Sequence, residues 1–308
     1  MLNRRILRIK AFKELFAIEM LPDKSLAKAR QELDVANEST RDLYLFMMAF
    51  IPALTATALA RQEQAKLKVN KTKEDLSPNL KFIENSLSQI LLDDPDFGKL
   101  LKKKSLSWDQ YDIILKKTYS SILQKQYFND YMNSQERSLL EDCRLFIRIF
   151  EEELFGREDL ESMLEDMSIW WNDDLAYSLT WCCRSLEDIS VTRRWSLPPL
   201  FLSDKDKSKD DDRAFVHKLL ETAYVNYDKF TQAVSKAVPN WDSDRIVGTD
   251  LALIVTALAE IVAFPSIPVN VSINEYVEIS KYYGTAKSST FVNGILDTLS
   301  KQVEFKKQ

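Results

Sequence analysis

A chain of 308 residues with a formal net charge of −5 has ample material for a hydrophobic core, in one large domain or two modest ones. Its composition is 45% hydrophobic and 29% charged with only five glycines, which is typical of a soluble and mostly helical protein. The negative balance gives no global sign of nucleic-acid binding, so any such site must be a local basic patch.

Several classes of function lack their sequence signals. No apolar run approaches the ~20 residues of a membrane-spanning helix, and no signal-peptide pattern precedes the charged N-terminus. Three cysteines and one histidine make neither a convincing zinc site nor a disulfide framework. There is no glycine-rich phosphate loop, metal-ligand spacing or Ser-His-Asp arrangement. We therefore expect a cytoplasmic protein that is not an enzyme and uses no cofactor, metal or membrane.

The first predicted helix covers residues 3–19. Arg4, Arg5 and Arg8 fall within about 100° of one another on a helical wheel, and Phe12 and Phe16 continue along that face. Arginines at a helix N-terminus oppose the helix dipole, at a few tenths of a kcal/mol each. The cluster therefore indicates a polyanionic partner, and the alternative is a basic helix end that is merely solvated.

The middle of the chain has apolar helical periodicity throughout. Helices are predicted over residues 33–61, 82–92, 108–132, 136–154 and 160–186, and Pro52 is expected to start or kink a segment. Charge is segregated: Lys102 to Lys104 are basic, whereas residues 151–174 carry ten acids against a single arginine. These runs are either solvated faces or a docking surface for a basic partner.

A linker and two further helices follow. Residues 204–212 alternate lysine and aspartate without apolar residues, which is typical of a linker. The next helices are predicted over 215–238 and 244–262, with a break at 239–241.

The C-terminal stretch is predicted to form two helices. Ser272 and Glu275 have the spacing of a capping box, which predicts a helix from 273 to 283 ended by Gly284 in the left-handed conformation. Ser288 or Ser289 then caps a second helix with one apolar stripe. Gly294 inside that helix favours close backbone approach to a neighbouring helix, with Asn293 making a buried hydrogen bond.

Ordered motifs in this stretch resemble the C-terminal part of the NusB family of bacterial antitermination factors. They are Ile267-Pro268, Ile273-Asn274-Glu275, Gly284 and Phe291-Val292-Asn293-Gly294-Ile295-Leu296-Asp297. The first helix, with Arg4-Arg5-Ile6-Leu7-Arg8, is similar to the arginine-rich first helix of that family. The resemblance covers about 1–20 and 210–300, and the residues between have no counterpart.

The resemblance implies an all-α fold, a NusB-like helical bundle with a large inserted helical domain. Residues 1–20 would supply the first helix, 21–209 the insertion and 210–308 the remainder of the bundle. Family members bind the boxA element of nascent RNA and pair with the ribosomal protein NusE in the transcription elongation complex, so these are the expected partners.

The expected RNA-binding residues are basic or aromatic side chains at the two ends of the resemblance: Arg4, Arg5, Arg8, Phe12, Phe16, Lys287 and Phe291. Lys287 stands where the family usually has acids, four residues before Phe291, and its alternative is an ordinary exposed lysine. Two other functions stay open. One is the non-catalytic NusB-like domain of some ribosomal-RNA methyltransferases, although no cofactor-binding domain follows here. The other is a helical scaffold that has lost RNA binding and works through the insertion.

Overall fold

The computed structural model describes residues 1–67, 69–70, 72, 77–205, 211–237 and 248–304. The chain divides into two compact units: the first unit joins Met1–Asn37 to Pro199–Gln308, and the second unit is Glu38–Pro198. The described residues are helical apart from turns, short loops and one isolated parallel bridge between Leu2 and Phe201, which confirms the predicted all-α class.

The second unit begins and ends close to, but not at, the expected insertion 21–209. The second unit begins inside α2, between Asn37 and Glu38, rather than at residue 21, because this helix runs without interruption from Leu26 to Lys66. The assignment of an inserted domain with its own role stays a prediction.

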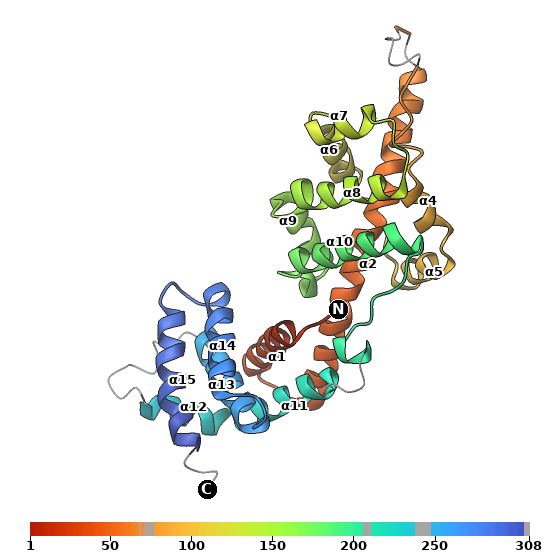
Figure 1. Ribbon diagram of the computed structural model, residues 1–308. Helices are drawn as coiled ribbons and strands as arrows, with labels where there is room; N and C mark the ends of the chain where they lie inside the picture. The colour runs from red at the N-terminus through yellow and green to blue at the C-terminus, as the bar shows by residue number, and fades with distance from the viewer. Residues whose placement is uncertain (68, 71, 73–76, 206–210, 238–247, 305–308) are drawn as a thin grey trace. The chain divides into compact units, whose positions relative to one another are not determined.

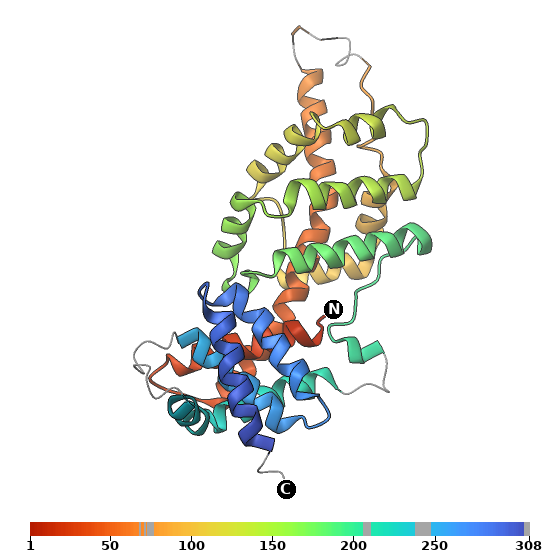
Figure 2. The same cartoon turned by 60° about the vertical axis from the view of Figure 1, so that its left-hand side comes forward.

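The first unit contains the ends of the chain. Its helices are α1 (Arg4–Glu19), the start of α2 (Leu26–Lys66), α11 (Asp212–Val225), α12 (Tyr227–Ala237), α13 (Gly248–Ala263), α14 (Val269–Tyr283) and α15 (Ser288–Glu304). The most apolar of these is α13, which is buried along most of its length and packs against α1, α11, α14 and α15. Figures 1 and 2 both show α15 alongside α14. The first unit is therefore a bundle with α13 at its centre.

The second unit contains the rest of α2 and a series of shorter helices. They are α4 (Ser86–Asp93), α5 (Pro95–Lys104), α6 (Asp112–Ile122), α7 (Gln126–Asn133), α8 (Leu139–Ile149), the π-helical turn η1 (Phe150–Leu154), α9 (Glu158–Met167), the 3₁₀ turn η2 (Ile169–Trp171) and α10 (Leu175–Thr192). Two predicted helices of this unit, 108–132 and 160–186, are thus each divided by turns, as is the predicted helix 215–238 of the first unit, which a turn at Asn226 divides into α11 and α12. Pro52 lies inside α2 and does not start a new segment.

Aromatic side chains form much of the core of the second unit. The Phe46 ring stacks on Trp108 at 4.4 Å and on Trp171 at 5.5 Å. The indole N–H of Trp108 donates to the Phe46 carbonyl at 2.8 Å, and that of Trp171 donates to the Ser39 carbonyl at 3.0 Å. Both buried indole N–H groups therefore have a hydrogen-bond acceptor, as buried polar groups require. Trp171 and Trp195 are buried, whereas Trp170 and Trp181 are half-buried.

The predicted start of α14 is wrong. The helix begins at Val269 after Pro268, which places Ser272 inside it rather than at its cap. Pro268 supplies a fixed φ and no N–H, which suits a helix start. The Ser272 hydroxyl donates instead to Glu260 at 2.6 Å, so no capping box forms with Glu275.

The first of the two helices ends at Gly284 as predicted, but the conformation predicted for Gly284 and the role predicted for Gly294 are wrong. Gly284 is extended, with φ −107° and ψ −170°, and it is required by crowding: an added Cβ would lie 2.3 Å from the Ser288 Cβ. Gly294 has nothing within 4 Å of an added Cβ, and Asn293 beside it is exposed. Close helix packing therefore does not explain Gly294.

Within the part of the chain that the structure describes, one helix is long and apolar enough to cross a membrane by length and composition, contrary to the sequence expectation. It is α2, and 67% of its most apolar window is buried inside the protein. A buried core helix meets the same criterion, so this is weak evidence for a membrane span.

The break predicted at 239–241 and most of the linker predicted at 204–212 lie outside the described residues.

Candidate functional site

The N-terminal end of α1 carries the three predicted arginines. Asn3 caps this end, because its side chain accepts a hydrogen bond from the Ile6 backbone N–H at 3.0 Å. The first turn of α1 holds no acid that would balance the arginines. Acids from other helices of the first unit do so instead, and they differ for each arginine.

Arg8 forms a buried ion pair with Glu260 of α13. Its Nε and Nη2 atoms donate to the two carboxylate oxygens at 2.7 and 2.8 Å, and the two side chains are 6% and 0% exposed. Ser272 and Tyr276 also donate to this carboxylate, at 2.6 and 3.2 Å. Burial acts to lower the pKa of Arg8, but the hydrogen bonds and charge of Glu260 outweigh it and raise the pKa. Arg8 is thus part of the interior and is not placed to meet a phosphate.

Arg5 forms a similar pair at the surface. Its Nε and Nη2 atoms donate to the two oxygens of Glu275 at 2.9 and 2.7 Å. The Arg5 side chain is 51% exposed, and its hydrogen bonds hold the pKa of the Glu275 carboxyl below its ordinary value. A solvent-exposed pair of this kind is weak enough for Arg5 to exchange a carboxylate for a phosphate.

The side chain of Arg4 is intermediate in exposure between those of Arg8 and Arg5. Its Nε atom donates to Asp212 at 2.7 Å, and its guanidinium lies 4.0 Å from the centre of the Phe215 ring. These contacts tie the start of α1 to the start of α11.

The two predicted aromatic contacts on α1 differ in accessibility. Phe12 is buried, at 2% exposed, and meets the Tyr283 ring edge-on at 5.5 Å. Phe16 is half-buried beside the start of α13, where an added Cβ on Gly248 would lie 3.3 Å from its ring. Phe12 is therefore a core residue, and Phe16 is the more accessible of the two.

The start of α15 presents the remaining predicted residues. Lys287 is exposed, and its side chain has no hydrogen bond or ion pair among the described residues. The Phe291 N–H donates to the Lys287 carbonyl at 3.1 Å, so a helical turn joins them and they share a face. Phe291 is half-buried. Lys287 and Phe291 therefore share a face as predicted, with the cation one helical turn before a partly accessible aromatic ring.

Ser288 fixes the beginning of α15. Its hydroxyl accepts from the Thr285 N–H at 2.8 Å and donates to the buried Asp250 of α13 at 2.8 Å. Ser288 is the first residue of the helix, and its hydroxyl bonds to Thr285 and Asp250 rather than to an N–H group of the first turn, so the predicted cap by Ser288 is wrong. The bond to Asp250 attaches the end that bears Lys287 to the centre of the bundle.

The structure separates the predicted residues into two groups. The pairs Arg5–Glu275 and Phe12–Tyr283 show that α1 and α14 run in the same direction. Arg5 and Phe16 are eleven residues apart on α1, or roughly 17 Å along the helix axis. The arginines thus lie at one end of α1, and Phe16 lies at the other end, beside α13.

Sequence reasoning missed the acids that hold the arginines. Glu260, Glu275 and Asp212 are hundreds of residues from α1, and nothing in their local spacing marks them as partners. It also missed Tyr282, which is 83% exposed at the end of α14, and Lys13, whose ammonium lies 5.7 Å from the Tyr283 ring. The adjacent tyrosines Tyr282 and Tyr283 were the sequence feature that could have indicated an exposed aromatic side chain.

Glu14 is a further buried acid on α1. Burial raises its pKa to about 7, and the charge of Glu32 adds to this while that of Lys28 opposes it. It is therefore the carboxyl of α1 that titrates near neutral pH.

The described residues show no group that could hold a metal ion. Burial raises the pKa of the Cys143 thiol to about 12 and that of Cys183 to about 11, so neither is a thiolate at neutral pH.

Comparison with known proteins places this chain in a family. The NusB family model matches residues 185–301. Similar proteins include the transcription antitermination proteins NusB of Alkaliphilus oremlandii (35% identical over 29% of this chain and 64% of that protein) and Bacillus subtilis (36% over 33% and 74%). That of Natranaerobius thermophilus is 33% identical over 32% of this chain and 71% of its own length. No solved structure matches. These matches show that the chain belongs to the NusB family.

Proposed function

We propose that this protein is a transcription antitermination factor that binds boxA-type RNA together with NusE. Family membership and the similarity to transcription antitermination proteins support the antitermination role. The NusB family consists of transcription factors rather than enzymes, and within this proposal the protein acts in the cytoplasm on the transcription elongation complex.

The observation that carries RNA binding is the start of α15. Lys287 is an exposed cation, and Phe291 is a partly accessible ring one turn later. An unpaired base can stack on an aromatic side chain while a neighbouring cation neutralises its phosphate, which is the usual way in which single-stranded RNA is bound. Lys287 lies at the N-terminal edge of α15, where the helix dipole disfavours a positive charge. An anionic partner would offset this unfavourable interaction.

The second contact in the proposal is the exposed end of α1. Arg5 is half-exposed and can turn from Glu275 to a phosphate, and Arg4 is partly exposed beside it. Arg8 and Phe12 are left out of the direct contacts because both are buried. Phosphates bound at the start of α1 and at the start of α15 would make the affinity for RNA fall as the salt concentration rises.

A filter-binding assay with the full chain tests the proposal. Wild-type protein is titrated against boxA RNA and a scrambled RNA of the same composition, each with and without NusE. We expect tighter binding of boxA RNA and a further gain with NusE. Equal affinity for the two RNAs, unchanged by NusE, would favour the alternative that the protein is a scaffold that works through its second unit.

A further inference from the structure

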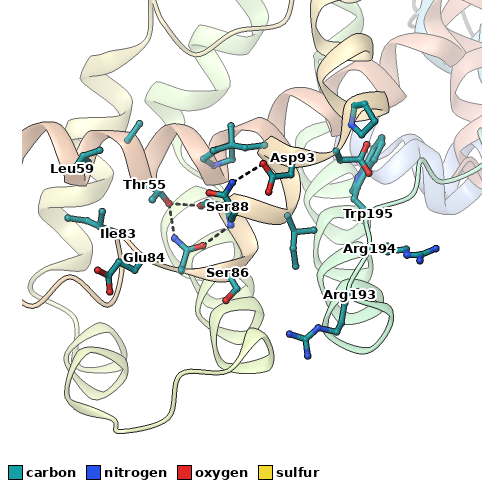
Figure 3. Close-up of a pocket in the computed structure, with 18 residues that line it drawn as sticks. Thr55, Leu59, Ile83, Glu84, Ser86, Ser88, Asp93, Arg193, Arg194 and Trp195 are labelled. Carbon is teal, nitrogen blue, oxygen red and sulfur yellow. Dashed lines mark hydrogen bonds between the residues drawn. The ribbon is translucent and has the colours of Figure 1, made fainter.

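The second unit has an open groove that the proposed RNA function does not use. It has a volume of about 890 Å³ and lies between α2, the turn before α4, α4 itself and the end of α10 (Figure 3). Its apolar lining includes Pro52, Ala56, Leu59, Ile90 and Leu92. Leu59 is 43% exposed and Leu92 is 66% exposed, so the groove presents large apolar side chains to solvent.

The polar groups in the floor of the groove already have partners. The Asn85 amide donates to Thr55 at 3.0 Å, and Thr55 and Ser88 share a hydrogen bond of 2.7 Å. The Ser88 N–H in turn donates to Asn85 at 2.8 Å (Figure 3). An occupant would therefore gain by burying apolar surface there, since the floor offers few open hydrogen-bonding groups.

The acids that line the groove also have partners. Glu84 pairs with Arg137 at 3.4 Å, and Asp93 accepts from the Gln89 amide at 2.8 Å. Asp94 caps α5 by accepting from the Asp96 and Phe97 N–H groups. These contacts satisfy hydrogen-bonding groups of the acids, but only Glu84 is paired with a cation, so Asp93 and Asp94 keep their negative charge.

The two arginines at the opposite side of the groove have no such partners in the described ranges. Arg193 and Arg194 are exposed, and among the described residues neither side chain has an ion pair or hydrogen bond. Figure 3 shows Arg193 extending from the end of α10 toward the Ser86 side of the groove, whereas Arg194 points the other way. Arg193 also holds a left-handed backbone conformation, with φ 57° and ψ 24°, which is strained for a residue with a side chain. Within the described chain, Arg193 is therefore an unpaired cation at the edge of the groove.

We propose that this groove binds an amphipathic helix of a partner protein, with a leucine-rich face on Leu59 and Leu92 and acidic residues at Arg193. Helices dock in this way by placing an apolar stripe in an open apolar groove. The acids Glu84, Asp93 and Asp94 along the lining would repel a nucleic acid, which needs an extended row of cations. A short acidic end on an otherwise apolar helix face satisfies both the exposed leucines and the unpaired arginine.

A peptide selection with the full-length protein tests this inference. The probe is a phage-displayed library of helical 16-residue peptides, with leucine at the apolar positions and Asp, Glu, Lys or Ser allowed at the positions beside them. We expect the selected peptides to be acidic at those positions. Selected peptides that are basic or show no charge preference would overturn the proposal.

Charge-reversal variants then locate the peptide, with fluorescence anisotropy as the readout. Arg193→Glu should weaken binding of a selected peptide by about tenfold, as expected for the loss of a charge pair at an interface. Leu92→Asp, at a side chain already exposed, should abolish it. Lys103→Glu is the matched control, because Lys103 is an exposed cation of the same unit outside the groove, and it should leave binding unchanged.

A charge exchange completes the test. A peptide with its acids replaced by lysine should bind Arg193→Glu more tightly than it binds wild type. Equal effects of Arg193→Glu and Lys103→Glu would overturn the inference. So would wild-type dimerisation that Leu92→Asp abolishes, because the groove would then bind a second copy of the chain.

Discussion

Replacing Arg8 with methionine should destabilise the first unit strongly. The substitution keeps an apolar stem of similar length but removes two charge-assisted hydrogen bonds to Glu260, which is 0% exposed. The Glu260 carboxylate would keep only the hydroxyl donors Ser272 and Tyr276. Breaking a buried ion pair by removing one partner costs about 3–5 kcal/mol, because the other charge stays buried without compensation. That is a large part of the 5–15 kcal/mol by which a domain is stable.

Two further variants isolate the cause. Arg8→Met combined with Glu260→Gln should be more stable than Arg8→Met alone, because the amide carries no charge, its oxygen can accept from one of the two hydroxyls of Ser272 and Tyr276, and its NH2 group can donate to the other. Arg5→Met is the matched control on the same helix, and its exposed pair with Glu275 should contribute at most about 1 kcal/mol.

The assay is urea unfolding followed by circular dichroism. Hydrogen exchange of peptides from α1 and α13 assigns the change to the first unit, because the chain has two units that need not unfold together. If Arg8→Met loses no more than Arg5→Met, or if adding Glu260→Gln lowers stability further, the buried pair does not have the role described.

Three other changes have defined outcomes. Gly294→Ala should stabilise the first unit by about 1 kcal/mol in urea unfolding, because the site is helical and open, and a loss of stability would mean that the glycine is needed there. Glu14→Gln should match wild type below pH about 4 and exceed it by about 3 kcal/mol above pH 8: the folded state holds the Glu14 proton up to pH about 7 and the unfolded state releases it near 4.5, so wild-type stability falls as pH rises between these values. A pH profile that the substitution leaves unchanged would contradict this. Arg5→Ala should weaken boxA binding and reduce the salt slope by about 0.7 with little change in melting temperature, and an unchanged slope would remove Arg5 from the RNA surface.

The sequence was sufficient for features that depend on local periodicity. The helix 3–19 and the apolar stripe of the last helix were predicted to within a residue or two, because amphipathic spacing and caps such as Asn3 act over a single turn. The turns that divide α6 from α7 and α9 from α10 were missed, since apolar periodicity continues across them.

Features that depend on distant residues could not be predicted. Ser272 has the local spacing of a cap, but Pro268 starts the helix earlier and Glu260 takes its hydroxyl. Arg4, Arg5 and Arg8 share one sector of a helical wheel, yet their exposures differ because acids of α11, α13 and α14 meet them at different depths. Burial of an arginine depends on the partner that tertiary structure brings to it.

The most direct test of the RNA surface is the Lys287→Asp variant in a boxA binding assay over a salt series. We predict that it binds boxA RNA about fivefold or more weakly than wild type, equivalent to about 1 kcal/mol, with a shallower salt dependence. Its melting temperature should be equal or slightly higher, since an acid at the start of α15 suits the helix dipole. Binding as tight as that of wild type at low salt, with the same salt slope, would contradict the assignment of RNA binding to this end of α15.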